Sequence, residues 1–234
     1  IVATTTPERA FPSAAVLLQN KLDIKDCFAF DINAACTGFI YALDIADKYI
    51  KNNSINNILV VGTEKMSSLV DWSDRNTCVL FGDGAGAVII SLSNNPGIIS
   101  STIGSNGSYK DLLTVNPDSD FIEMKGNDVF KIAVNTMGKI ARETLDANDL
   151  KIDDVDWLIP HQANSRIINA IAKKLSLPSE KIILTVGNHG NTSAASIPLA
   201  IDYATQTGDL KKEDTILLEA FGAGFTWGST LLKF

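Results

Sequence analysis

Short apolar runs alternate with helical patterns along the first third of the chain. The runs Ile1–Thr6, Cys27–Phe30 and Ile58–Val61 have the length and the β-branched or aromatic content of buried strands. Apolar residues at helical spacing occupy Pro12–Leu22 and Phe39–Ile50 between them. This alternation predicts an α/β fold with mostly parallel sheets that are covered by helices.

The alternation continues to the C-terminus. Two further strands, Cys78–Phe81 and Ala87–Ser91, are predicted to be joined by a tight turn at Gly82–Gly86, because a strand pattern rather than a helix follows these glycines. Later strands are predicted at Gly97–Ser101, Val155–Ile159, Lys181–Leu184, Ile216–Leu218 and Gly228–Phe234, and helices at Asp128–Leu145, Ser165–Leu175 and Thr192–Ala204.

Two parts of the sequence match at a constant offset of 158 positions. Ala42–Ala46 aligns with Ala200–Ala204, and the pair that begins at Ile58 aligns with the pair that begins at Ile216. A repeat of this kind predicts two copies of one βαβαβ unit. We expect a first half at residues 1–95 and a second half at residues 96–234.

The two copies differ in what precedes them. The strand Gly97–Ser101 and the helix Asp128–Leu145 lie ahead of the second copy, whereas nothing lies ahead of Ile1. The repeat therefore predicts that one strand and one helix of the first half are absent from this chain.

Cys36 lies where a strand passes into a helix. Asn33 is a good N-cap residue, so Cys36 is expected in the first helical turn, where unpaired N–H groups and the helix dipole lower a thiol pKa from its usual ~8.5. Small neighbours leave room for a substrate beside the sulfur. The alternative is that Cys36 is a small buried hydrophobe, as most free cysteines are. This stretch alone supports both interpretations equally.

Two histidines are candidates for a site at the junction of the halves. His161 follows the strand Val155–Ile159, at the sheet edge where α/β proteins bind ligands, and His189 lies in the loop Gly187–Asn191. The repeat places Asn33 on Asn191, so two helix starts should face each other across the junction. The residues alone leave the choice between the two histidines open.

Composition and charge narrow the class of protein. Hydrophobic residues make up 45% of the chain and charged residues 20%, as in an ordinary soluble enzyme, and the net charge of −7 disfavours nucleic acid and anionic membrane as partners. Three cysteines do not make a disulfide framework, which indicates a reducing cytoplasm. Cys27 and Cys78 are expected to be buried structural residues.

Several stretches in combination resemble the β-ketoacyl-acyl carrier protein synthase III family. These stretches are AACTGF (34–39), FGDGAGA (81–87), IPHQAN (159–164), GNHGNTSAAS (187–196) and EAFGAGFTWGS (219–229). The resemblance covers residues 1–234 and implies a thiolase-type fold with αβαβα layers. It also implies condensation of acetyl-coenzyme A with malonyl-acyl carrier protein, by decarboxylation and through an acyl-cysteine. The implied catalytic triad is Cys36, His161 and Asn191, and the asparagine disfavours Cys–His–His and Cys–His–Cys relatives.

The resemblance assigns further residues. Backbone N–H groups of Cys36 and Ala223 would form an oxyanion hole, although Ala223 stands where the family usually has glycine. Phe11 would cross a homodimer interface to the partner's acyl pocket, and Lys131 and Arg166 would dock acyl carrier protein. Coenzyme A and its pantetheine arm would contact Arg75, Met124, Gly126, Phe130, Ala163 and Asn164. Neither a metal nor a permanently bound cofactor is implied.

Two other functions remain open at this point. A relative with the same triad could use another starter, as polyketide-type synthases do. A catalytically silent subunit that binds acyl carrier protein is the non-enzymatic alternative. The length of the starter acyl chain does not follow from the sequence, because pocket depth depends on packing across the dimer.

Overall fold

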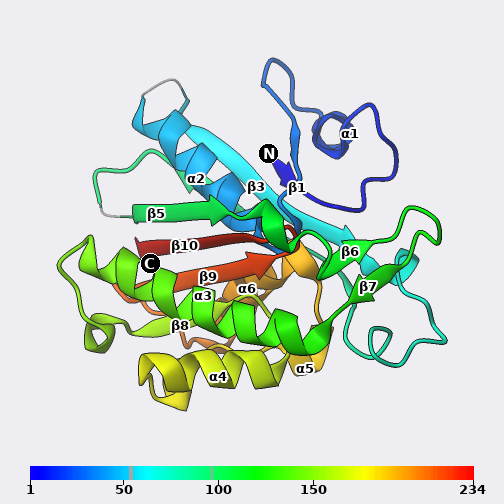
Figure 1. Cartoon of the computed structure of the whole chain (residues 1–234). Helices are drawn as coiled ribbons and strands as arrows, with labels where there is room; N and C mark the ends of the chain where they lie inside the picture. The colour runs from blue at the N-terminus through cyan, green and yellow to red at the C-terminus, as the bar shows by residue number, and fades with distance from the viewer. Residues whose placement is uncertain (53–54, 96) are drawn as a thin grey trace.

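Two four-stranded mixed sheets run through the molecule (Figure 1), and the computed structural model describes residues 1–52, 55–95 and 97–234. The first sheet has the order β2-β1-β3-β4 and the second the order β5-β10-β9-β8. The strands of the first sheet are β1 (Val2–Ala3), β2 (Asp31–Ile32), β3 (Asn57–Lys65) and β4 (Asp83–Ser91). Those of the second are β5 (Ile98–Ser105), β8 (Trp157–Pro160), β9 (Thr215–Gly222) and β10 (Thr226–Lys233), and β6 (Leu113–Val115) and β7 (Ile122–Met124) form a separate ribbon.

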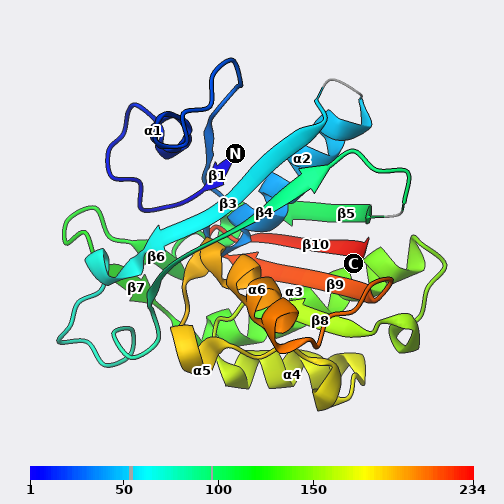
Figure 2. The same cartoon turned by 180° about the vertical axis from the view of Figure 1, so that it is seen from behind.

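Helices lie between the sheets and on their outer faces. Side chains of α2 and α6 share one core with both sheets, so these two helices form the middle layer (Figure 2). Helices α3 and α4 cover the outer face of the second sheet, and α1 lies beside the first. The predicted αβαβα layering is thereby confirmed. The helices are α1 (Ala14–Lys21), α2 (Gly38–Lys51), α3 (Gly126–Asp146), α4 (Ser165–Leu175), α5 (Val186–His189) and α6 (Ser196–Thr207).

The repeat of 158 positions holds in the backbone as well as in the sequence. Val2 pairs with Val61 in the first sheet, and Pro160 pairs with Glu219 in the second. Each residue of the second pair lies 158 positions after its counterpart in the first. A 3₁₀ turn precedes the middle-layer helix of each half, at Ala35–Thr37 and at Ser193–Ala195. The first residue of each turn has the same positive φ of 48°. The chain is therefore a duplicated α/β unit.

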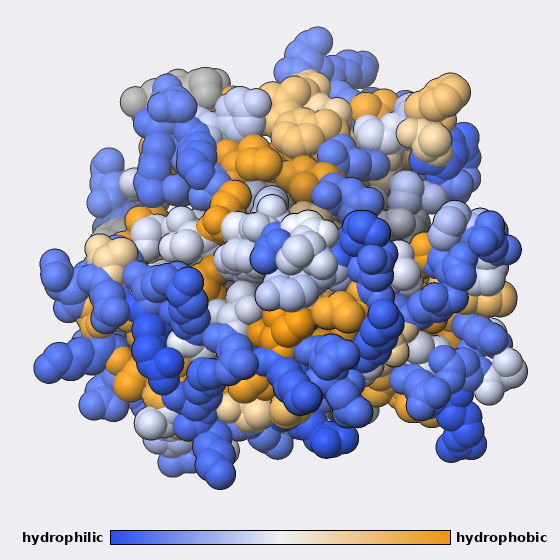
Figure 3. Space-filling model, in the orientation of Figure 1, coloured by the Kyte–Doolittle hydropathy of each residue, from blue (hydrophilic) through white to orange (hydrophobic). Residues whose placement is uncertain are grey.

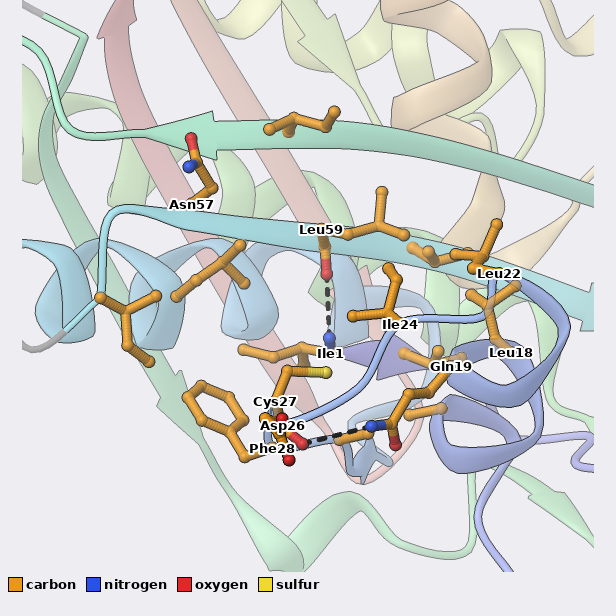
Figure 4. A pocket seen from close by; sticks show the side chains of 17 residues that line it. Ile1, Leu18, Gln19, Leu22, Ile24, Asp26, Cys27, Phe28, Asn57 and Leu59 are labelled. Atoms are coloured by element: carbon orange, nitrogen blue, oxygen red, sulfur yellow. Dashed lines mark hydrogen bonds between the residues drawn. The ribbon is translucent and has the colours of Figure 1, made fainter.

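The two sheets are covered unequally. In the second sheet, β10 is paired with β5 and packs against α3. Its counterpart in the first sheet, β4, is an edge strand. Leu231 of β10 is fully buried, but Ile89, its counterpart in the register of the first sheet, is 69% exposed. A cavity of about 410 Å³ lies between β3, β4 and α1 (Figure 4), and apolar surface is visible between α1 and α2 (Figure 3). Among the described residues, the first sheet has no counterpart of β5 and α3.

The predicted division at residues 95 and 96 remains a proposal, since residue 96 lies outside the described residues.

Three strand predictions were wrong. Cys27–Phe30 is irregular and Cys27 is exposed, because pairing begins only at Asp31. Cys78–Phe81 is a turn whose side chains pack on a small apolar cluster, and Lys181–Leu184 makes a single bridge through Ile182. Apolar composition therefore predicted neither strand pairing nor full burial here, since Phe28, Val79 and Leu184 are 42%, 63% and 46% exposed.

The glycine-rich segment Gly82–Gly86 is also not a turn. Gly84 and Gly86 lie within β4, paired with β3, and α6 packs directly on them. A Cβ on Gly86 would lie 2.9 Å from the backbone nitrogen of Leu199. These glycines therefore permit close packing of a helix on the strand.

Gly62 gives a direct test of how tightly the halves are joined. A Cβ at this position of β3 would lie 2.2 Å from the backbone oxygen of Ala194, which cannot rotate away. We expect Gly62→Ala to lower the free energy of unfolding by about 3 kcal/mol, measured by urea denaturation. Gly107→Ala, where the added Cβ meets nothing within 4 Å, is the control. Equal stability of the two variants would contradict this packing.

Candidate active site

Cys36 sits in the 3₁₀ turn immediately before α2, at the junction of the two halves. The turn begins at Ala35, whose N–H is bonded by the Asn33 side chain at 3.3 Å. Gly222, at the end of β9, lies so close that a Cβ there would be 2.8 Å from the Cys36 nitrogen. Cys36 thus precedes the α-helix. The sequence analysis had predicted it in the first helical turn.

Burial dominates the acidity of the Cys36 thiol. Loss of contact with water raises its pKa to about 11, a hydrogen bond with the Ser193 side chain opposes this, and the charge of Glu64 adds to the rise. The expectation of a lowered pKa was wrong, because the helix start is too deeply buried for its N–H groups to outweigh desolvation. Cys36 is a protonated thiol at neutral pH.

His161 is fixed at the end of β8 in its neutral form. The backbone N–H of His161 donates to the Glu219 backbone carbonyl at 2.6 Å, and the ring Nδ1 lies 2.7 Å from the Ser196 hydroxyl. That hydroxyl also accepts the Gln162 backbone N–H at 3.3 Å, and its own proton is free to bond Nδ1. In the tautomer that uses this bond, the ring proton lies on Nε2. Burial lowers the pKa of His161 to about 4, so the ring is a neutral donor at pH 7.

Asn191 is held by both halves. The backbone N–H of Asn191 donates to the Leu80 carbonyl at 2.8 Å, and its backbone carbonyl accepts the Gly82 N–H at 3.0 Å. The side-chain oxygen accepts the Ser193 N–H at 2.9 Å. With Oδ1 occupied, the Asn191 side chain presents its NH₂ group as a donor. Gly82 permits this contact, because a Cβ there would lie 2.3 Å from the His189 carbonyl.

The three predicted catalytic residues line one narrow cavity of about 50 Å³. Its other lining residues include three of those assigned to the pantetheine arm, namely Met124, Ala163 and Asn164. A wider cavity of about 550 Å³ also reaches Cys36 and is lined by the loop that carries Ala223. Cys36 is therefore reached from two sides, with mostly apolar walls between the halves.

The other predicted site residues lie at varying distances from these cavities. Phe130 on α3 stacks under Arg166 on α4, with 5.9 Å from the guanidinium carbon to the ring centre. Lys131 is exposed and follows Phe130 in the sequence. A Cβ atom added at Gly126 would lie 3.8 Å from the Met124 methyl carbon. Arg75, in an exposed turn, and Phe11, which is 84% exposed, are outside both cavities. Their predicted roles remain proposals. Asn164 also caps α4 by accepting the Ile167 N–H.

His189 differs from His161 in its surroundings. It is exposed at the end of α5 and does not line the cavity that holds Cys36. Only its backbone approaches the site, through the contact with Gly82. The structure therefore favours His161 over His189 on burial and position.

Sequence reasoning missed the polar residues that support the triad. The Gln162 side chain donates to the Pro160 and Ile183 carbonyls and accepts the N–H groups of Thr185 and Val186, which orders the loop before Asn191. Ser193, Ser196 and Glu64 were also missed. The repeat was the available signal for Ser193, since it places this residue on Ala35 beside Cys36.

The described residues contain neither a metal-binding cluster nor a membrane-spanning helix. No cluster of three or more His, Cys, Asp or Glu side chains could hold a metal ion there. Within the same residues, none of the helices combines the length and apolarity needed to cross a bilayer.

Comparison with known proteins adds independent information. The family model described as 3-oxoacyl-[acyl-carrier-protein (ACP)] synthase III matches residues 30–107, and that of the C-terminal part of this family matches residues 145–234. The β-ketoacyl-[acyl-carrier-protein] synthase III of Methylococcus capsulatus is 56% identical, with 100% of this chain and 76% of the relative covered. The protein of that name from Coxiella burnetii is 53% identical, with 100% and 75% covered.

Solved structures agree with these matches. The 3-oxoacyl-[acyl-carrier-protein] synthase III of Aquifex aeolicus superimposes with a TM-score of 0.98 at 50% identity, covering 100% of this chain and 76% of that one. The priming β-ketosynthase of a polyketide biosynthetic pathway gives a TM-score of 0.93 at 33% identity, covering 99% and 73%. Fold and site together define a thiolase-fold condensing enzyme, an acyltransferase. Within that class, the chain belongs to the β-ketoacyl-acyl carrier protein synthase III family.

The protonation state of His161 can be measured directly. A His189→Gln variant leaves His161 as the single histidine, and its ring ¹³C and ¹H signals should stay those of a neutral imidazole from pH 8 down to about pH 5. Because the unfolded chain protonates its histidine near pH 6.5 and the native chain near pH 4, stability should fall as pH drops between these values. A titration midpoint near 6.5 in the native protein would contradict the neutral donor.

Proposed function

We propose that the enzyme condenses acetyl-coenzyme A with malonyl-acyl carrier protein through an acyl-Cys36 intermediate. The products are acetoacetyl-acyl carrier protein, carbon dioxide and coenzyme A. The observation that carries this proposal is that Cys36, His161 and Asn191 line one cavity at the junction of the halves. A buried thiol beside two neutral hydrogen-bond donors suits acyl transfer followed by decarboxylation.

Acyl transfer comes first in this proposal. The Cys36 sulfur attacks the acetyl thioester carbon, the bond from that carbon to the coenzyme sulfur breaks, and the thiol proton ends on the coenzyme thiol. The Cys36 N–H lies beside Gly222, next to Ala223, so backbone donors of both halves can reach the developing oxyanion. An alanine at position 223 keeps its N–H, so this departure from the family pattern should have little effect.

Decarboxylation follows on the same donors. As carbon dioxide leaves the malonyl group, negative charge moves to the thioester oxygen. His161 Nε2–H and the Asn191 NH₂ group can both donate to that oxygen, because their other polar atoms are engaged by Ser196 and Ser193. The carbanion then attacks the acetyl carbon on Cys36, the carbon–sulfur bond breaks to release the product, and the Cys36 thiolate takes up a proton from water. The donor residues need no change of protonation state.

Partner binding rests on the outer residues of this site. Lys131 and Arg166 are exposed at the neighbouring starts of α3 and α4, close to Met124 and Asn164 of the cavity wall. On a chain of net charge −7, a local basic pair would attract the acidic carrier protein. We also propose a cytoplasmic homodimer in which exposed Phe11 reaches the partner's acyl pocket.

A longer or aromatic starter is the second candidate. The priming polyketide β-ketosynthase shares the fold at 33% identity, and the cavity of about 550 Å³ beside Cys36 exceeds what acetyl needs. The higher identity to fatty-acid type relatives, up to 56%, favours acetyl. Mass measurement of acyl-Cys36 over a series of acyl-coenzyme A lengths separates the two, and no acylation by any of them would favour a silent subunit.

Substitutions in the triad should affect different steps of the reaction. Cys36→Ala should abolish acyl-enzyme formation. His161→Ala and Asn191→Ala should mainly lose malonyl decarboxylation, since removal of one oxyanion donor costs about 3 kcal/mol, or roughly a hundredfold in rate. Release of labelled carbon dioxide measures this step. His189→Ala is the control, and the assignment fails if that variant, and not His161→Ala, loses decarboxylation.

Carrier-protein docking should respond to charge reversal. We expect Arg166→Glu to raise KM for malonyl-acyl carrier protein at least tenfold at low salt and to change KM for acetyl-coenzyme A far less. Lys131→Glu should act in the same direction. Lys212→Glu, an exposed lysine at the opposite end of β9, is the control. Equal effects on both substrates, or no dependence on salt, would rule out this docking surface.

A further inference from the structure

Gln162 lies two residues after the end of β8 and is 1% exposed. Its side-chain Nε2 donates to the carbonyls of Pro160 and Ile183 at 2.8 and 3.1 Å. Its Oε1 accepts the backbone N–H groups of Thr185 and Val186 at 2.7 and 3.0 Å. An amide has two donor hydrogens and two acceptor lone pairs, and these four bonds use all of them. Because it also lines neither cavity that reaches the candidate nucleophile, this side chain supports the site and does not contact a substrate.

The segment 184–189, which carries α5, is anchored by this glutamine. Leu184 and residues 187–189 are exposed, so little apolar packing holds the segment. Its other backbone hydrogen bonds lie within the single turn of α5. In the part of the chain that the structure describes, both hydrogen bonds from this segment to another element end at Gln162 Oε1.

This anchor connects the two hydrogen-bond donors of the site. On one side, the backbone N–H of Gln162 donates to the Ser196 hydroxyl, which lies 2.7 Å from His161 Nδ1. On the other side, the anchored segment leads through Gly190 to Asn191. Gln162 therefore fixes the chain that carries one donor relative to the residue that carries the other.

We propose that Gln162 is a positioning residue, which holds the segment 184–189 so that Asn191 and His161 can donate to one thioester oxygen. The inference rests on the decarboxylation proposed for these two donors. Because a hydrogen bond weakens steeply with distance and angle, a small displacement of Asn191 removes much of its effect on the developing negative charge. Acetyl transfer to Cys36, which is proposed to use backbone donors, depends far less on Gln162.

The first test replaces the amide by a side chain of similar length that cannot hold the segment. Gln162→Met should lower kcat for malonyl decarboxylation about tenfold and change KM for malonyl-acyl carrier protein and the rate of Cys36 acetylation less than about twofold. Gln206→Met, at an exposed glutamine of α6, is the matched control and should behave as the unmodified protein. Equal losses of acetylation and decarboxylation would indicate a general structural defect and overturn the proposal.

A double-mutant cycle tests whether Gln162 acts through Asn191. In an Asn191→Ala background, Gln162→Met should cause no further loss of decarboxylation, because the donor that it positions is already removed. In a His161→Ala background, the same substitution should still lower the residual rate about tenfold. A full tenfold loss in the Asn191→Ala background would contradict the proposal.

Gln162→Glu provides a second variant, in case Gln162→Met does not fold. The introduced carboxyl group still accepts from Thr185 and Val186, but when ionised it also turns an oxygen toward two carbonyl oxygens. Protonation restores a donor there, and burial raises the pKa of this group, so decarboxylation should rise at least about threefold from pH 8 to pH 6 relative to the unmodified protein. His161 stays neutral over this range. A rate equal to that of the unmodified protein at both pH values would overturn the proposal.

Hydrogen exchange tests the anchor without any substrate. At one pH, the backbone N–H groups of Thr185 and Val186 should exchange at least about tenfold faster in Gln162→Met than in the unmodified protein, whereas those of α4 should not change. Unchanged exchange at these two residues would refute the positioning role, whatever the activity. Absence of both Cys36 acetylation and decarboxylation in the unmodified protein would refute the proposed function instead, so the two failures are distinguishable.

Discussion

Direct backbone contact between the two halves is the constraint on which the rest of the structure depends. The 3₁₀ turn before α6 rests on β3 at Gly62, and the turn before α2 rests on β9 at Gly222. Neither contact leaves space for a Cβ atom, so each helix start is in direct backbone contact with a strand. This contact brings Cys36, His161 and Asn191 to one cavity. Asn191, held by Leu80 and Gly82 of the other half, shows the same dependence.

Burial at this junction acts on the two reactive side chains in a consistent way. It raises the pKa of Cys36 to about 11 and lowers that of His161 to about 4, and both shifts favour the neutral form. The junction therefore holds a neutral thiol and a neutral imidazole, with the Glu64 carboxylate held nearby by hydrogen bonds from Thr5, Thr6 and Ser193. In the proposed reaction, the negative charge that develops on the substrate would lie between mostly apolar walls, where each hydrogen bond to it is stronger.

Much of the fold and the position of the candidate site could be predicted, because duplication and apolar periodicity are visible in the sequence itself. The repeat located both helix starts, and helix Ser165–Leu175 was predicted with its observed bounds. What failed depended on tertiary context. Cys78–Phe81 has a strand-like composition but packs as a turn, and the thiol pKa of Cys36 depends on burial that no helix-start rule includes. The supporting residues Gln162 and Ser196 could not be identified, since their partners come from distant segments.

Position 64 and position 222 are equivalent in the two copies, 158 residues apart, yet one is a glutamate and the other a glycine. At Cys36 the glycine adds no side chain beside the helix start, and a cavity reaches the cysteine. At the other start, where Ala194 takes the place of Cys36, the Glu64 carboxylate already lies against Ser193. The protein's own carboxylate therefore takes, at the second helix start, the place that stays open beside a cavity at the first, and the two copies have diverged at one equivalent position.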